Sequence, residues 1–397
     1  MSEIVLNINI LNVENQKFIN DNLNSDIKSL MLKGIRLDGV SDKEIVEQIE
    51  SKKKAETKLP TWFNTAKIYY PNKLNIEQTS SEITASYKAS LISGRTLIDI
   101  TGGFGVDAFY FSKRFEQVVH CETNKALSLI SKHNFDALKA QNIDNLFIDG
   151  IEHLKMHNTS YDWIYCDPSR RHDEKGKVYF LKDCIPNIPE HLPLLLQRSE
   201  NLLVKTSPLL DISMGIKDLN CVKDIHVVAV NNEVKEILWV LNKNFYGNKT
   251  IYAINLGSDA NVPFTVEWES EKRNEANYSL PLAYLYEPNT AILKTGAFNC
   301  VANQFNVHKL HQHSHLYTSN ELVQFPGRRF SIECVVPYNR RASAIRTIEK
   351  ANISTRNFPE SVHKIRETFK IKDGGDAYLF FTTDLNGQKV VIICSKI

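Results

Sequence analysis

The sequence predicts an α/β protein in which a mainly parallel β-sheet is wound with helices. From Arg95 onward, short apolar runs alternate with helix-length segments, which is the pattern of strand–helix–strand units. The last two runs are joined by a short polar segment, so we expect them to form a hairpin that ends the sheet in an antiparallel pair. Helical spacing dominates the start of the chain, whereas its end is rich in strands. We expect seven strands in this sheet, at 96–100, 117–122, 145–149, 163–167, 201–205, 225–230 and 236–242.

The length and composition indicate a multidomain protein of the cytoplasm. At 397 residues the chain exceeds one ordinary core, and we expect a helical region at 1–90, the α/β domain at 91–275 and small α+β modules after it. No run approaches the roughly 20 apolar residues of a membrane span. The N-terminus carries acidic and polar residues where a signal peptide would carry basic ones. The seven cysteines lie far apart without a CxxC pair, which fits a reducing compartment.

Positive charge is concentrated at the end of the chain. Residues 321–397 hold 13 Lys and Arg against 8 Asp and Glu, whereas the preceding residues hold 35 against 38. A basic end module is typical of nucleic-acid binding, and a solvated surface rich in lysine and arginine is the alternative. "FPGRRF" and "YNRR" place arginines among aromatic residues, which suits stacking and phosphate contact with single-stranded RNA. These arginines are Arg328, Arg329, Arg340 and Arg341, and exposed residues bordering strands are the alternative.

The segment "DITGGFGVDA", at the end of the first predicted strand, is a strong indication of a ligand site, because ligands bind beyond the carboxyl ends of strands in open α/β sheets. Its "GFGVDA" matches the dinucleotide fingerprint G-x-G-x-x-G/A, but the lysine of a P-loop is missing. We expect Gly102, Gly103 and Gly105 to let the backbone approach the ligand and to adopt positive φ. Asp99 and Asp107 would repel a pyrophosphate and attract the ammonium and sulfonium of S-adenosylmethionine. A nicotinamide cofactor is the alternative.

Acidic residues also end the next two strands. Glu122, 19 residues after Gly103, is placed to accept hydrogen bonds from ribose hydroxyls, which both cofactors carry. Asp149 is placed to accept a hydrogen bond from an adenine amino group. For each acid, helix N-capping or simple exposure is the alternative. Three acids at three successive strand ends favour a ligand site.

The fourth strand ends in "DPSRR". Asp167 and Pro168 predict a rigid turn whose carboxylate faces a target amine, while Arg170 and Arg171 are candidates to hold a phosphate. A proline turn with solvated arginines is the alternative. Lys205 ends the fifth strand in "LLVKTSP", either as a substrate contact or as an ordinary exposed lysine.

Taken in order, "DITGGFGVD", "CETN", "DPSRR" and "LVKTSPLLD" resemble a bacterial family of class I S-adenosylmethionine-dependent methyltransferases. "EQTSSEITASYKA" upstream and "YEPNTAILKTGAF", "FPGRRFSIECVVPYNRR" and "NFPESVHKIRETFKIKDGGDAYLFFTT" downstream are similar to the same family. The resemblance implies a Rossmann-like methyltransferase sheet, a ferredoxin-like insert at 276–320 and a THUMP-like domain at 321–397. Since THUMP domains accompany RNA-modifying enzymes, it also implies an RNA substrate, with rRNA and tRNA as the candidates.

The resemblance further implies roles for individual residues. The ribose of S-adenosylmethionine would contact Glu122 and its adenine Asp149. Its methionine part would contact the segment from Asp99 to Asp107, that is Asp99, Thr101, Gly102, Gly103, Phe104, Gly105 and Asp107. The catalytic acceptor site would consist of Asp167, Pro168, Ser169 and Arg170. Further substrate contacts are expected from Arg171, Lys205, Arg328 and Arg329.

Direct methyl transfer to a nitrogen or oxygen is the expected chemistry. Ser169 and Arg170 stand where exocyclic-amine methylases carry a second proline and an aromatic residue, which disfavours N6-adenine methylation. Carbon-5 pyrimidine methylation needs a cysteine nucleophile, and we expect Cys166 to point into the sheet. Asp167 would then orient or deprotonate the acceptor.

Other functions fit the same pattern. They are a methyltransferase acting on a protein or small molecule, and a non-catalytic RNA-binding protein that retains the cofactor fold. "HKLHQHSH" brings together His308, His311, His313 and His315, but this spacing matches no common zinc pattern. We therefore expect RNA contact or a polar loop there, and no metal.

Overall fold

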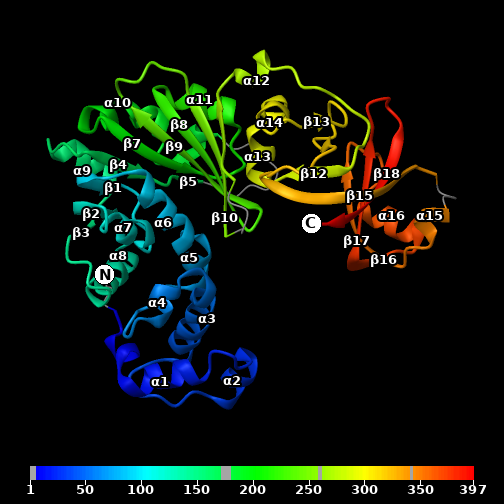
Figure 1. Ribbon diagram of the computed structural model, residues 1–397. Helices are drawn as coiled ribbons and strands as arrows, with labels where there is room; N and C mark the ends of the chain where they lie inside the picture. Colours follow the sequence, from blue (N-terminus) through cyan, green and yellow to red (C-terminus); the bar gives the residue numbers. More distant parts are fainter. Residues whose placement is uncertain (1–5, 171–179, 258–261, 340–342) are drawn as a thin grey trace. The chain divides into compact units, whose positions relative to one another are not determined.

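The computed structural model describes residues 6–170, 180–257, 262–339 and 343–397 (Figure 1). Three predicted contact residues, Arg171, Arg340 and Arg341, lie outside this description, as does the side chain of Arg170. Among the described residues, no helix combines the length and the apolar character needed to cross a bilayer. The chain divides into two compact units, Met1–Lys223 with Leu238–Tyr246, and Asp224–Ile237 with Gly247–Ile397.

Helices make up the described N-terminal region, as the sequence predicts. Ser41 and Glu44 form a capping box at the start of α3, and Ser81 caps α6. The helix α6 buries Ala85, Lys88 and Ala89 on one face. The elements are η1 (Ile8–Leu11), α1 (Val13–Asp21), α2 (Ile27–Lys33), α3 (Asp42–Lys58), α4 (Pro60–Asn64), α5 (Lys73–Gln78) and α6 (Glu82–Leu91).

A sheet with the strand order β11-β10-β8-β9-β7-β4-β1-β2-β3 follows (Figure 1). The central strands β7, β4, β1, β2 and β3 pair in parallel, which confirms the predicted parallel arrangement. The strands are β1 (Gly94–Asp99), β2 (Phe115–Glu122), β3 (Ile143–Phe147), β4 (Trp163–Cys166), β7 (Asn201–Thr206), β8 (Val222–Val230), β9 (Glu233–Asn242), β10 (Thr250–Leu256) and β11 (Phe264–Glu267). The connecting elements are α7 (Val106–Phe111), α8 (Lys125–Ala137), α9 (Gly150–Met156), β5 (Ser169–Arg170), η2 (Leu181–Asp183), β6 (Cys184–Ile185), α10 (Ile188–Arg198) and α11 (Ile212–Leu219).

The prediction of seven strands is wrong, because this sheet has nine. After the β8–β9 hairpin, whose turn residues Asn231 and Asn232 have the positive φ of a type I′ turn, β10 pairs in parallel with β8. The strand β11 then pairs antiparallel with β10. Only two residues are buried in each of these strands. The sequence did not reveal them because the apolar run of β10, "TIYAINL", lies beyond the hairpin that was expected to end the sheet, and β11 has only four residues.

The second unit is built on a sheet with the order β13-β14-β12-β15-β18-β17-β16. The strands β17 and β18 form the antiparallel pair predicted around "DLNGQ", while β16 pairs in parallel with β17. Ile345, Ile365 and Phe369 of two helices pack in one core with Phe381 and Val391 of the sheet. The elements are α12 (Ser270–Arg273), β12 (Tyr284–Pro288), α13 (Thr290–Thr295), α14 (Phe298–Gln304), β13 (His308–Lys309), β14 (Tyr317–Ser319), β15 (Gly327–Pro337), α15 (Ser343–Arg346), β16 (Lys350–Arg356), α16 (Val362–Phe369), β17 (Lys372–Thr383) and β18 (Lys389–Lys396).

Candidate functional site

The glycine loop follows β1 at the point where the strand order of the sheet reverses between β1 and β4. Gly103 (φ +63°) and Gly105 (φ +82°) have the positive φ that glycine tolerates best. For Gly102 that prediction is wrong, because its φ is not positive. A Cβ on Gly102 would lie 2.4 Å from Nε2 of His120 and 2.8 Å from the carbonyl oxygen of Cys121. Close packing therefore explains this glycine.

Glu122, the last residue of β2, ties the loop to the sheet. Its Oε2 accepts a hydrogen bond from the Gly103 amide at 2.7 Å, and its Oε1 accepts one from the Asn124 amide at 2.6 Å. The Ser131 hydroxyl of α8 donates to the Gly103 carbonyl at 2.9 Å. The carboxylate predicted to face a ribose thus lies directly beside the glycine loop.

Thr101 connects the ends of β1 and β4. Its amide and hydroxyl donate to Oδ1 of Asp99, at 3.0 and 3.3 Å. The amide of Asp167 donates to the Thr101 hydroxyl oxygen at 2.7 Å. One side chain therefore brings the predicted cofactor residue Asp99 and the predicted acceptor residue Asp167 to the same edge of the sheet.

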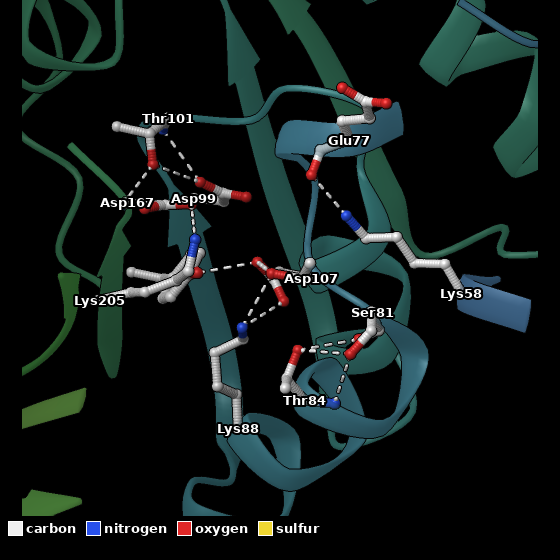
Figure 2. A network of polar contacts seen from close by, with 12 residues as sticks. Lys58, Glu77, Ser81, Thr84, Lys88, Asp99, Thr101, Asp107, Asp167 and Lys205 are labelled. Atoms are coloured by element: carbon white, nitrogen blue, oxygen red, sulfur yellow. Dashed lines mark hydrogen bonds and ion pairs between the residues drawn. The ribbon is translucent and has the colours of Figure 1, made fainter. Parts of the chain in front are cut away.

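Asp107, in the first turn of α7, lies at the centre of a buried polar network (Figure 2). Lys88 Nζ is 3.1 Å from Asp107 Oδ1 and donates to the Ser80 hydroxyl at 2.9 Å. The hydroxyls of Ser80 and Tyr165 each donate to Asp107 Oδ2 at 2.8 Å. Lys88 is fully buried, so its charge is shielded from water and directed at Asp107.

This network corrects the charge argument made from the sequence, which treated Asp107 as a bare carboxylate beside the ligand. Burial raises the pKa of Asp107, but Lys88, Lys205 and the two hydroxyls outweigh burial and hold that pKa below its ordinary value. Asp107 is therefore one half of an ion pair, and the positive charge of Lys88 offsets its negative charge.

Sequence reasoning missed Lys88, Ser80 and Tyr165. Ser80 and Lys88 lie in "EQTSSEITASYKA", where Lys88 falls between Ala85 and Ala89 on the buried face of α6. A lysine in that position needs a buried counter-ion. The sequence pattern of the helix therefore predicts a buried counter-ion for Lys88, but it does not identify the acidic residue.

Burial opposes the ionisation of Asp99. It is 1% exposed, and burial, together with the neighbouring charges of Asp107 and Asp167, raises its pKa well above the ordinary value, although the Thr101 amide opposes this. Asp107 and Asp167 each have a lysine partner, whereas Asp99 is held by Thr101. A cation beside Asp99 would relieve this repulsion.

The acceptor turn after β4 combines a buried proline with a partly exposed acid. Lys205 Nζ lies 2.5 Å from Asp167 Oδ2, and the two side chains are 15% and 33% exposed, so Lys205 is not an ordinary exposed lysine. Pro168 is buried, whereas Ser169 is exposed and pairs with Ile185 in the small β5–β6 ribbon. The proline thus anchors the turn and the carboxylate of Asp167 stays accessible.

Asp149 and Phe104 have structural contacts at their predicted positions. β3 ends at Phe147, two residues before the predicted end, and Asp149 caps α9 by accepting hydrogen bonds from the amides of Ile151 and Glu152. Phe104 is buried, with its ring centroid 6.2 Å from that of Trp62.

Cys166 is 1% exposed, and burial raises the pKa of its thiol well above the ordinary value. A thiolate is the nucleophilic form of cysteine. This side chain is therefore unsuited to attack a pyrimidine ring.

The two described arginines of "FPGRRF" differ. Glu287, which is 4% exposed on its side chain, accepts hydrogen bonds from Arg328 Nε at 2.6 Å and from Arg356 at 2.8 Å. Arg328 is therefore part of a structural ion pair. The guanidinium group of Arg329 donates a hydrogen bond to the neutral side-chain amide oxygen of Gln324 at 3.4 Å, at the surface.

The histidine cluster is spread over separate contacts. His315 stacks on Phe298 with centroids 3.6 Å apart, and burial lowers its pKa to about 4. His311 shares a hydrogen bond with Asn357 at 3.1 Å. Within the described parts of the chain, no three His, Cys, Asp or Glu side chains are grouped to hold a metal ion.

Two domain families match the C-terminal part of the chain. One is described as a ferredoxin-like domain and matches residues 284–326, and the other is described as THUMP domain-like and matches residues 327–396. No curated protein matches the chain.

Solved structures resemble the chain over all or part of its length. A crystal structure described as a "putative methyltransferase" from Porphyromonas gingivalis is 33% identical, with a TM-score of 0.88 and 96% of each chain covered. An O-methyltransferase from Bacillus cereus in complex with SAH is 12% identical, with a TM-score of 0.34, and covers 43% of this chain and 88% of that one. The identity and coverage of the first show that this chain belongs to the bacterial family of class I S-adenosylmethionine-dependent methyltransferases with a ferredoxin-like insert and a THUMP-like C-terminal domain.

Proposed function

We propose that the protein transfers a methyl group from S-adenosylmethionine directly to a nitrogen or oxygen of an RNA. The observation that carries the proposal is the buried carboxyl group of Asp99, which lies beside the glycine loop and, within the described residues, lacks the lysine partner that Asp107 and Asp167 have. A ligand with an ammonium and a sulfonium compensates this charge, whereas a pyrophosphate would add to the repulsion.

The residues present fit S-adenosylmethionine. Gly102, Gly103 and Gly105 leave the loop without side chains, and Glu122 holds it by the Gly103 amide. Asp99 would hold the cationic end, and Glu122 and Asp149, at the ends of two neighbouring strands, would receive the ribose and the adenine. The bound cofactor supplies a methyl group on a good leaving group.

The chain's own contribution is alignment and proton removal. Asp167, held by Lys205 and by the Thr101 hydroxyl, is placed to orient the acceptor or to accept its proton, next to Ser169 and the backbone of Arg170. Alignment of donor and acceptor alone is worth about 7–11 kcal/mol in well-oriented reactions. Arg171, together with Lys205, remains a proposed substrate contact.

Support for an RNA substrate comes from the THUMP-like match and from the excess of Lys and Arg in residues 321–397. Two experiments test the function. Calorimetric titration with S-adenosylmethionine tests the cofactor, and a folded sample without a binding signal would refute it. Nucleoside mass spectrometry of total RNA, with and without the gene, tests the substrate; unchanged nucleosides would favour a protein or a small molecule instead.

Affinity for S-adenosylmethionine should rise with pH. Because the pKa of Asp99 is raised, its carboxyl group keeps its proton where an ordinary aspartate is ionised, and a cation binds only the ionised form. The stability of the unliganded protein should change in the opposite direction. A raised carboxyl pKa contributes stability that is full below the unfolded pKa and is lost as pH rises through the folded pKa. Titrations in mildly acidic to mildly alkaline buffers measure the first trend. Asp99→Asn should bind weakly with a flat profile, and a flat wild-type profile would contradict this reading.

Arg329→Ala should weaken RNA binding and reduce the slope of log affinity against log salt by about one. Arg328→Ala should mainly lower stability, because it removes one of the two guanidinium partners of the buried Glu287. Fluorescence anisotropy with bulk tRNA or rRNA at several salt concentrations measures the first effect, and thermal denaturation measures the second. Equal salt slopes for wild type and Arg329→Ala would exclude Arg329 as a phosphate contact.

A further inference from the structure

The fully buried Lys88 belongs to the N-terminal helical region, yet its Nζ lies 3.1 Å from Asp107 in the helix that follows the glycine loop. We call Lys88, Ser80, Asp107 and Tyr165 the Lys88 network. Four segments meet in it, because Ser80 precedes α6, Lys88 lies in α6, Asp107 begins α7 and Tyr165 lies in β4. Buried side chains are rarely charged unless a partner of opposite charge is held beside them.

The Lys88 network includes residues adjacent in sequence to both parts of the candidate site, the glycine loop and the acceptor turn. Asp107 lies two residues after Gly105, so its position fixes where α7 begins and the loop ends. Tyr165 lies two residues before Asp167, and its hydroxyl binds the same Asp107 oxygen as the Ser80 hydroxyl. At the front of the site, Thr101 bridges Asp99 and the Asp167 amide. The loop and the acceptor turn are therefore clamped at two points.

The site contains two lysine–aspartate ion pairs, Lys88 with Asp107 and Lys205 with Asp167 (Figure 2). Lys205 also acts electrostatically on Asp107. If Lys88 were lost, the buried charge of Asp107 would have Lys205 as its remaining nearby cation. Lys205 would then be drawn toward Asp107 and away from Asp167.

We propose that Lys88 is a positioning residue of the methyl-donor pocket, which acts through Asp107 and Tyr165 to hold the glycine loop and the acceptor turn in register. This makes the N-terminal helical region part of the active centre rather than an appended module. The inference rests on the proposed binding of S-adenosylmethionine.

The test compares a single variant that breaks the ion pair with a double variant that removes both of its charges, read out as affinity for S-adenosylmethionine in calorimetric titration. Lys88→Met leaves Asp107 buried without its partner and should weaken binding about tenfold or more. The double variant Lys88→Met with Asp107→Asn removes both charges and keeps an oxygen for the Ser80 and Tyr165 hydroxyls. It should bind more tightly than Lys88→Met and within about threefold of wild type.

Lys52→Met is the matched control. Lys52 is another buried lysine of the N-terminal region, and it is 9% exposed. Its Nζ contacts the neutral side chain of Asn20 at 2.7 Å rather than an acid. Its removal should lower stability and leave affinity within about twofold of wild type. If Lys88→Met does not fold, Tyr165→Phe takes its place, because it removes a single hydrogen bond to Asp107; a weakening of about threefold is expected.

The outcomes separate the two proposals. A folded wild-type protein that does not bind S-adenosylmethionine refutes the proposed function. If wild type binds and folded Lys88→Met or Tyr165→Phe binds equally well, the Lys88 network is structural only and the inference fails. If the double variant binds no better than Lys88→Met, Asp107 itself contacts the donor, which also contradicts a purely positioning role.

Discussion

Asp167→Ala should reduce methyl transfer by about 10²- to 10⁴-fold while S-adenosylmethionine affinity stays within about threefold of wild type. The substitution removes the partly exposed carboxylate that is placed to orient or deprotonate the acceptor, and it leaves Lys205 without that partner. The turn itself should persist, because the amide of residue 167 still donates to the Thr101 hydroxyl and Pro168 stays buried. Transfer of a labelled methyl group to RNA from cells that lack the gene measures the rate, and calorimetry measures the affinity.

Asp183→Ala is the control for this experiment, because Asp183 is an exposed aspartate of the short helix η2 in the same sheet connection. It should transfer methyl groups at the wild-type rate. If Asp167→Ala also retained that rate, the "DPSRR" turn would not be the acceptor site, and the proposed roles of Asp167 and Lys205 would be withdrawn.

Gly102→Ala should destabilise the protein by about 1–3 kcal/mol and abolish S-adenosylmethionine binding at accessible concentrations. The new methyl group would lie 2.4 and 2.5 Å from two ring atoms of His120. That ring cannot easily move, since it is fully buried, its Nδ1 is hydrogen-bonded to Asn145 at 2.8 Å and it packs edge-on against Phe135. The loop must therefore shift instead. Chemical denaturation and calorimetric titration measure the two effects.

Two further variants identify the cause. Gly103→Ala has its nearest neighbour 4.0 Å away, so its cost should come from the positive φ of that residue, about 1–2 kcal/mol. His120→Ala removes the two nearest clashing atoms and leaves the Cys121 carbonyl oxygen at 2.8 Å, so the destabilisation of the double variant should be smaller than the sum of the two single destabilisations. Strictly additive costs would show that the clash with His120 is not the cause.

The sequence predicts the central strands β1, β4 and β7 well because each of them buries three or more consecutive side chains. Runs such as "TLIDI" and "NLLVK" are nearly continuous in apolar residues, and helix-length segments separate them. The strand β11 lies at the edge of the sheet and buries only two side chains, and β10 beside it lies beyond the hairpin at which the sheet was expected to end. Ser81 and Asn124 cap α6 and α8, and residues of these types are local sequence signals of a helix start.

The order of strand-end residues along the chain predicts a site at one edge of a parallel sheet, because all carboxyl ends of parallel strands meet there. This reasoning needs no contacts, and it places Asp99, Glu122 and Asp167 around one glycine loop. Which charges remain available for a ligand is a different question. Charge pairing depends on distances of a few ångströms between segments that are remote in sequence. Only the tertiary structure shows that Lys88 neutralises Asp107, that Lys205 holds Asp167 and that Thr101 holds the buried Asp99.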